Sequence, residues 1–188
     1  IDAINIYSKI SKKKSKLSLP SSDFILLTLH RAENVDNKKI LSSIIKGLIN
    51  SNENIIFPIH PRTKKRLHEF DLYEKLLQNK NIHLLNSVGY FDILELMKNC
   101  NFIITDSGGL QEEATSPIIR KKVLVIRKTT DRPEAVESKL AQIIGLNSKN
   151  ISNSIKKTIE NPKLDSKITP YGKGDASKKI IKVLKSKF

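Results

Sequence analysis

Four short polar clusters in the sequence carry side chains that could bind an anion or transfer a proton. Guanidinium groups pair well with phosphate oxygens, and imidazole is the side chain that changes charge most readily near neutral pH. Each cluster follows a short apolar run that is typical of a buried strand. The clusters are His30-Arg31-Ala32-Glu33-Asn34, His60-Pro61-Arg62, Asp106-Ser107-Gly108-Gly109, and Arg127 with Thr129-Thr130-Asp131-Arg132-Pro133-Glu134.

The turn Ser107-Gly108-Gly109 favours a phosphate-bearing ligand. Two glycines allow a sharp turn and a close approach of the backbone to a ligand. A helix is expected to begin here, and its free N–H groups suit a pyrophosphate, with the Ser107 hydroxyl as a further donor. The alternative is a tight strand–helix turn in which Asp106 or Ser107 only caps the helix. The turn alone favours neither interpretation.

Acidic and basic residues beside this turn allow the same two interpretations. Arg127 and Arg132 could neutralise phosphate charge, although an arginine at a strand end more often forms a salt bridge. Glu112 and Glu113 lie in the first turns of the expected helix, where the helix dipole favours acids. The functional alternative is that one of these carboxylates accepts hydrogen bonds from a ribose diol.

His30 and His60 each follow a strand directly, which indicates acid–base chemistry, ligand bonding or a metal. No third ligand has a diagnostic spacing, so no metal is expected. Glu33 could order the loop after His30 or take part in the chemistry. The glycine turn lacks the Gly-Lys-Ser/Thr of a Walker motif, and no Gly-x-Gly-x-x-Gly is present, so the usual kinase and dinucleotide-binding functions lose support.

The elements that must position these clusters alternate between strand and helix. Such alternation predicts right-handed crossovers and a doubly wound, Rossmann-like parallel sheet of about six strands, with ligands at the carboxyl ends of the strands. Strands are expected at residues 24–29, 55–59, 82–85, 102–105, 123–126 and 142–144. Helices are expected at 1–14, 37–50, 61–70, 73–78, 90–98, 109–114, 133–138, 148–160 and 176–184, with a loop at 30–36 and a linker at 17–23.

Length and composition indicate the number of domains and which kinds of partner are expected. A length of 188 residues fits one domain, and the net charge of +15 comes mostly from lysine. Nucleic-acid binding is a weaker alternative, because Trp is absent and arginines are not clustered.

No apolar run is long enough to span a membrane. The single Cys100 fits a reducing compartment, so we expect the cytoplasm. Because the chain begins with Ile1, we expect a processed product or a fragment.

Taken together, these motifs resemble the UDP-N-acetylglucosamine 2-epimerases, in the non-hydrolysing branch of that family. The resemblance covers nearly the whole chain. It is carried by His30-Arg31-Ala32-Glu33-Asn34, His60-Pro61, Thr105-Asp106-Ser107-Gly108-Gly109-Leu110-Gln111-Glu112-Glu113, Thr129-Thr130-Asp131-Arg132-Pro133-Glu134-Ala135-Val136 and the tail Pro170-Tyr171-Gly172-Lys173-Gly174-Asp175-Ala176-Ser177.

The resemblance implies the C-terminal half of a two-domain glycosyltransferase-B fold. Residues 1–22 then form an interdomain helix and linker, 23–168 a UDP-binding domain, and 169–188 a C-terminal loop and crossover helix. The implied partners are a UDP-sugar, a missing N-terminal domain of the same enzyme and a second copy in a homodimer, without nucleic acid or membrane. The family requires no redox cofactor and no metal.

The resemblance also implies roles for single residues. Ser107, Gly108 and Gly109 bind the diphosphate, and Glu113 binds the ribose hydroxyls. Arg31, His60, Arg127 and Arg132 are expected at the nucleotide-sugar site, and His30 and Glu33 are the expected catalytic side chains. The family reaction interconverts UDP-N-acetylglucosamine and UDP-N-acetylmannosamine by removing the carbon 2 proton, expelling UDP and re-adding it. The carboxylates that handle that proton belong to the N-terminal domain.

Three departures from the family pattern concern the shape of the site. Residues 114–127 form a longer run than usual, with the expected glycine replaced around Ile119 and Arg120. Ile93 stands where the family generally has a Phe that packs on uracil, and Phe91 is a candidate substitute. Residues 138–141 lack a common glycine. Two alternatives share the architecture: a UDP-sugar-dependent glycosyltransferase domain and a non-catalytic nucleotide-sugar-binding module.

Overall fold

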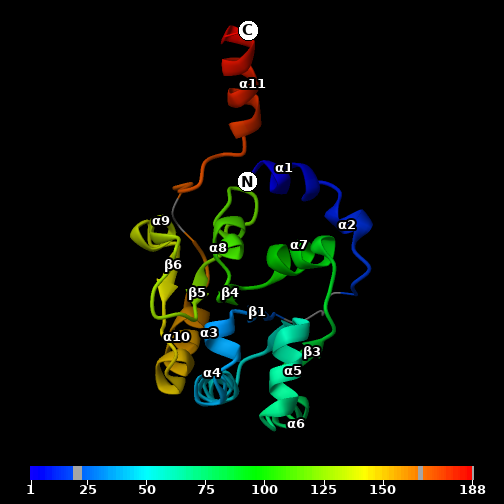
Figure 1. The fold of residues 1–188 in the computed structure, drawn as a ribbon, viewed down its shortest axis with the longest axis vertical. Helices are drawn as coiled ribbons and strands as arrows, with labels where there is room; N and C mark the ends of the chain where they lie inside the picture. The colour runs from blue at the N-terminus through cyan, green and yellow to red at the C-terminus, as the bar shows by residue number, and fades with distance from the viewer. Residues whose placement is uncertain (19–22, 165–166, 188) are drawn as a thin grey trace.

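The computed structural model describes residues 1–18, 23–164 and 167–187 (Figure 1). Within these residues, six parallel strands form one sheet in the order β3-β2-β1-β4-β5-β6. This order reverses direction beside β1, as in doubly wound sheets, and confirms the predicted fold class. The strands are β1 Ile25–Thr28, β2 Ile55–Pro58, β3 Ile82–Leu85, β4 Ile103–Thr105, β5 Val123–Val125 and β6 Ala141–Ile143.

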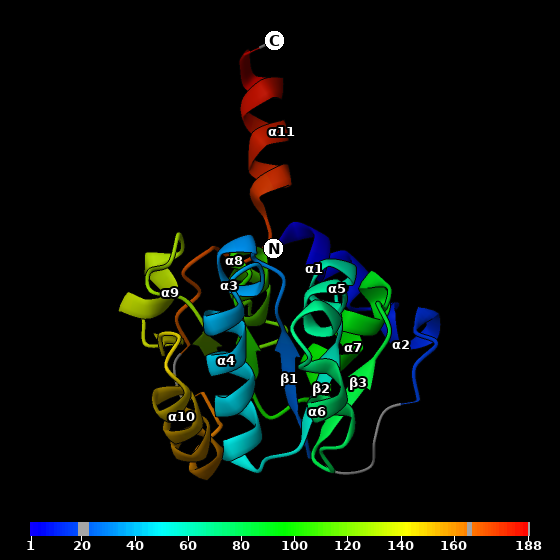
Figure 2. The same cartoon turned by 60° about the horizontal axis from the view of Figure 1, so that its bottom comes forward.

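Helices cover both faces of the sheet, and each face has its own apolar core (Figure 2). One core joins α4, α5, α6 and α10 to the sheet, and the other joins α1, α7, α8 and α9. The central strands β1, β2, β4 and β5 are buried along their whole length, as continuous apolar runs predict. The helices are α1 Asp2–Tyr7, α2 Ser11–Lys14, α3 Ala32–Val35, α4 Lys38–Ser51, α5 Pro61–Glu69, α6 Tyr73–Leu77, α7 Tyr90–Asn99, α8 Gly108–Ala114, α9 Pro133–Glu137, α10 Ser148–Glu160 and α11 Ala176–Lys187.

Two expectations about the first third of the chain were wrong. The predicted helix at 1–14 is divided into α1 and α2, because the Ser8 carbonyl accepts hydrogen bonds from the Ser11 hydroxyl and the Lys98 ammonium. The predicted loop at 30–36 contains α3, in which Asn34 and Val35 are buried. Residues 19–22 of the predicted linker lie outside the described residues.

The last helix, α11, extends away from the body of the domain (Figures 1 and 2). None of its residues is buried, and its apolar side chains are between 51% and 59% exposed. The start of α11 is held against α1, because the Asp2 carboxylate accepts from the backbone N–H groups of Ala176 and Ser177. The exposed apolar side chains are Ile180, Ile181, Val183 and Leu184. No helix in the described part of the chain has the length and apolar character that crossing a membrane requires.

Two of the departures from the family pattern coincide with left-handed backbone. Arg120 has φ +48° and Lys139 has φ +60°. Glycine adopts this conformation without the steric cost that a Cβ atom brings. The chain therefore keeps, at both positions, a turn that suits glycine while carrying a long basic side chain.

Candidate functional site

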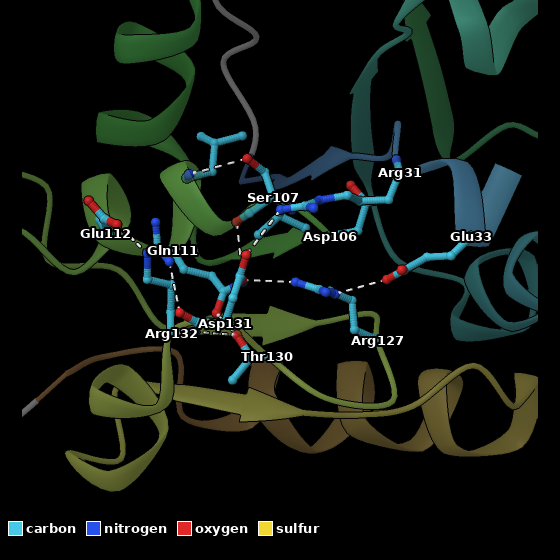
Figure 3. A network of polar contacts seen from close by, with 12 residues as sticks. Arg31, Glu33, Asp106, Ser107, Gln111, Glu112, Arg127, Thr130, Asp131 and Arg132 are labelled. Atoms are coloured by element: carbon cyan, nitrogen blue, oxygen red, sulfur yellow. Dashed lines mark hydrogen bonds and ion pairs between the residues drawn. The ribbon is translucent and has the colours of Figure 1, made fainter.

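The four polar clusters lie along the carboxyl edge of the sheet, as expected from parallel strands. Figure 3 shows the part of this edge where the loop after β1, the turn after β4 and the segment after β5 converge. Arg31 and Glu33 come from the first, Asp106 and Ser107 from the second, and Arg127 from the third. Three clusters that span about a hundred residues of sequence thus form one polar network.

Asp106 joins the loop after β1 to the turn after β4. Its side chain is fully buried and accepts hydrogen bonds from the backbone N–H of Arg31 at 2.8 Å and of His30 at 3.1 Å. The side-chain amide of Asn34 donates to the same carboxylate at 3.2 Å. The Nδ1 atom of His30 lies 3.3 Å from Asp106 Oδ1. Asp106 therefore fixes where His30 and Arg31 stand relative to the glycine turn, a role that its sequence position alone did not indicate.

The glycine turn is both a helix cap and a point of close approach. The Ser107 hydroxyl accepts from the N–H of Leu110 at 3.4 Å, which caps α8. The positive-φ glycines of the chain are at other positions, so a sharp turn is not why Gly108 and Gly109 are glycines. A Cβ on Gly108 would lie 3.0 Å from Asp131 Oδ1. Their lack of a side chain instead lets other groups approach the backbone closely.

Each of the three arginines predicted at the site is paired with a carboxylate (Figure 3). Arg31 Nη2 lies 3.3 Å from Asp131 Oδ2, and Arg127 Nη1 lies 2.9 Å from Asp131 Oδ1. Arg127 also donates to Glu33 at 3.0 Å through Nε. Arg132 donates to Glu112. The arginines are thus held in place by carboxylates that offset their charge.

A second set of hydrogen bonds positions the segment that carries Arg132. The buried Gln111 donates to the Ser107 carbonyl at 3.2 Å and accepts from the Thr130 hydroxyl at 2.8 Å. Tyr171 donates through its hydroxyl to the Arg132 carbonyl at 3.3 Å and accepts from the N–H of Ala135 at 3.1 Å. The terminal Pro-Tyr-Gly motif therefore braces the start of α9, a connection that the sequence did not reveal.

The two predicted histidines stand beside each other at the end of β1 and β2. Their ring centroids are 5.5 Å apart, and His60 Nδ1 accepts from the N–H of Arg62 at 3.2 Å. Both rings line a hollow of about 180 Å³ that Ile93 and Leu110 also line. Phe91 packs edge-on against Tyr7 instead. Ile93, which stands where the family pattern has a Phe, thus lines this hollow.

Glu113 lies on α8 directly after Glu112, the partner of Arg132, but its own hydrogen bond is to a residue of α7. Tyr90 donates through its hydroxyl to Glu113 Oε1 at 3.3 Å. Desolvation raises the pKa of the Glu113 carboxyl, although the hydrogen bond from Tyr90 opposes that rise. Burial and the charge of Glu113 raise the pKa of Tyr90 to about 12. A carboxylate in this setting can accept hydrogen bonds from neighbouring hydroxyl groups.

The other two histidines lie away from this edge network. His68 stacks on Tyr73 with ring centroids 4.0 Å apart, and His83 is an exposed residue of the edge strand β3. Across the ranges that the structure describes, no three His, Cys, Asp or Glu side chains are grouped to hold a metal ion.

Comparison with known proteins gives a family match and several similar relatives. The family model described as UDP-N-acetylglucosamine 2-epimerase matches residues 1–185. An enzyme of that name from Methanocaldococcus jannaschii is 44% identical over 166 residues, which cover 86% of this chain and 44% of the relative. Another from Methanococcus maripaludis is 41% identical over 180 residues, which cover 94% of this chain and 48% of the relative.

A solved structure supports the same relationship. The Methanocaldococcus jannaschii UDP-GlcNAc 2-epimerase, in complex with UDP-GlcNAc and UDP, superposes with a TM-score of 0.82 at 39% identity. The match covers 98% of this chain and 52% of that chain. The present chain therefore spans about half the length of the relatives it matches.

Proposed function

The chain belongs to the UDP-N-acetylglucosamine 2-epimerase family, and we propose that it is the UDP-binding half of an epimerase that interconverts UDP-N-acetylglucosamine and UDP-N-acetylmannosamine. The observation that carries this proposal is that Gly108, Arg31 and Arg127 all lie next to one carboxylate, that of Asp131, at the sheet edge. Bare backbone beside guanidinium groups is the chemistry that a diphosphate requires.

In the proposed reaction, this half holds the leaving group. Negative charge grows on the diphosphate as the bond to the sugar breaks, and donors already in position stabilise that charge. Ser107, Gly108 and Gly109 with Arg31, Arg127 and Arg132 form the proposed diphosphate site. Within this set, Asp106 holds the backbone of Arg31 and Gln111 holds the backbone of Ser107.

The remaining predicted residues are assigned to the two ends of the substrate. Glu113 accepts from the ribose hydroxyls, and the hollow lined by His60 and Ile93 accommodates the uridine side. His30 stands at the reacting end, positioned by Asp106, and Glu33 orders Arg127 beside it. The carboxylates that move the carbon 2 proton come, in this proposal, from an N-terminal half.

The proposed partners follow from the parts of the chain that lie outside the sheet. Residues 1–22 form the interdomain segment, 23–168 the UDP-binding domain and 169–188 the crossover segment. The exposed apolar residues of α11, such as Ile181 and Leu184, suit burial against an N-terminal half. We place the complete enzyme in the cytoplasm as a homodimer, and the single buried thiol of Cys100 fits a reducing compartment.

Calorimetry with UDP tests the binding part of the proposal. We expect one UDP per chain, with UDP-N-acetylglucosamine competing for the same site. Gly109→Ala is the informative variant, because the added Cβ meets the Ser107 hydroxyl only at 4.0 Å and leaves the protein unstrained. It should weaken UDP binding at least about tenfold, equivalent to 1.4 kcal/mol.

The matched control is Gly89→Ala, whose Cβ would contact Asp92 at 3.5 Å, outside the proposed diphosphate site. UDP affinity in this variant should equal that of the natural chain. Absence of UDP binding by the natural chain, or equal affinity of the natural chain and Gly109→Ala, would contradict the proposal.

Turnover tests the division of labour. Incubated with UDP-N-acetylglucosamine, the present chain should give no UDP-N-acetylmannosamine by proton NMR, because the carbon 2 base is elsewhere. A chain that also carries the N-terminal half should form it. Epimerisation by the present chain alone would show that the division between the two halves is wrong.

A further inference from the structure

The Asp131 carboxylate lies within the proposed diphosphate site. Both of its carboxylate oxygens are close to the bare backbone of Gly108, at 3.0 Å and 3.3 Å from the position of an added Cβ. The same oxygens pair with Arg31 at 3.3 Å and Arg127 at 2.9 Å. An anionic side chain of the protein thus makes the contacts that the site offers to an anionic ligand (Figure 3).

Two of the three neighbours of Asp131, Arg31 and Gly108, are distant in sequence, so the folded sheet edge and not the local sequence brings them to Asp131. Arg31 precedes α3 and Arg127 follows β5, while Gly108 begins α8. Desolvation by itself would raise the pKa of Asp131, but its own backbone N–H and the charges of Arg127 and Arg31 lower it. The carboxylate is therefore negatively charged at neutral pH and in mild acid.

A diphosphate cannot share this position with a carboxylate. Two anions in contact would repel each other, and both need the same guanidinium donors. The Asp131 side chain is 44% exposed, so it has room to rotate away into solvent. Arg127 is only 12% exposed and is also held by Glu33, so the guanidinium stays in place when the carboxylate leaves.

We propose that Asp131 is an internal competitor for the diphosphate, which must be displaced before a phosphate-bearing ligand reaches Arg31, Arg127 and Gly108. The residue then sets the selectivity of the site. A ligand that carries a diphosphate can replace the interactions of the carboxylate, whereas a neutral nucleoside has nothing with which to displace it. This inference rests on the proposed function. It means that a ligand binds at that site only when it replaces the ion pairs of Asp131.

The test is calorimetry on the full 188-residue chain with UDP, pyrophosphate and uridine as separate probes. Asp131→Asn removes the charge and keeps the shape, and Asp131→Ala removes both. Glu69→Gln is the matched control, because Glu69 also pairs with two cations, Arg66 and Lys65, and is 39% exposed. Melting temperatures of all variants confirm that each is folded.

Both Asp131 variants should bind UDP and pyrophosphate about three- to tenfold more tightly than the natural chain, the fold-change expected when two partly exposed ion pairs no longer compete. Uridine affinity should not change, and Glu69→Gln should bind all three probes as the natural chain does. A tighter complex in the Asp131 variants is the opposite of what loss of a merely structural contact would give.

Unchanged or weaker UDP and pyrophosphate binding in the Asp131 variants overturns the inference, as does an equal gain in Glu69→Gln. These outcomes leave the proposed function intact where the natural chain binds UDP. If the natural chain does not bind UDP and the Asp131 variants gain affinity for pyrophosphate alone, the proposed function fails and the competition stands. If no variant binds either anion, both fail.

Discussion

Single residues of this site differ in how far the sequence could foretell them. The places of Arg31, Arg127 and Arg132 near the carboxyl ends of strands could be predicted, because an arginine after a strand is recognisable in the sequence; their role in binding stays a prediction. Asp106 and Asp131 were seen only as parts of motifs. Their partners lie far away in the sequence, and only the folded sheet edge brings them within hydrogen-bonding distance. Carboxylates that position or compete for cations are therefore the residues that sequence patterns miss.

Glu113 gives a pH-dependent prediction at this level. Desolvation holds the pKa of its carboxyl above the ordinary value of 4.5, so the charged form is disfavoured in the folded protein. The contribution of Glu113 to the free energy of unfolding is therefore largest at pH values below the pKa that its carboxyl has in the unfolded chain. It is lost as the pH rises through the higher pKa of the folded protein. Glu113→Gln should therefore melt at a higher temperature than the natural chain at pH 7, and the difference should vanish by about pH 4.

The same variant should bind UDP more weakly at pH 7, by about tenfold or more, because a ribose hydroxyl loses a charged acceptor. Calorimetric melting and UDP titration on one preparation measure both effects. A variant that is less stable at pH 7, or one that binds UDP as well as the natural chain, would refute the assigned role of Glu113.

Whole helices and strands were predicted more completely than the residues that link them. The apolar runs and their spacing indicated every strand, and the bounds of β3 and α10 agree with the expectation. The division of α1 from α2 and the turn of α3 were missed, because both involve tertiary hydrogen bonds. The Lys98 ammonium donates to the Ser8 carbonyl, and the Asn34 amide donates to the Ile126 carbonyl. Local patterns cannot reveal a bond whose partner comes from another element.

Lys139 lies in the turn between α9 and β6, and its backbone conformation gives a prediction about the stability of that turn. Its φ of +60° suits glycine, and no ion pair of Lys139 occurs among the described residues. Lys139→Gly should raise the free energy of unfolding by about 1 kcal/mol, because it removes a left-handed Cβ. Denaturant titration measures the change. Lys139→Ala, which loses the charge and keeps the Cβ, should give no such gain; equal gains would assign the effect to charge instead.

For the molecule as a whole, the exposed apolar face of α11 is the feature on which the proposed contact with an N-terminal half depends. Its apolar side chains are more than half exposed and contribute little to the stability of this chain. Replacing Ile181 and Leu184 by Ser should therefore leave the melting temperature unchanged. If α11 crosses to an N-terminal half, the same variant should fail to associate with that half in a sedimentation experiment. Association at natural strength would contradict the proposed crossover.

We propose that the turn after β4 holds the diphosphate of a UDP-sugar, and amide NMR observes the backbone of that turn itself. The chain has only 7 glycines and a mass of 21.3 kDa, so its glycine amide signals can be assigned individually. On titration with UDP, the amide signals of Gly108 and Gly109 should shift most, while that of Gly47, which packs against α10, should stay in place. Signals of Gly108 and Gly109 that remain unmoved while UDP binds would contradict the account.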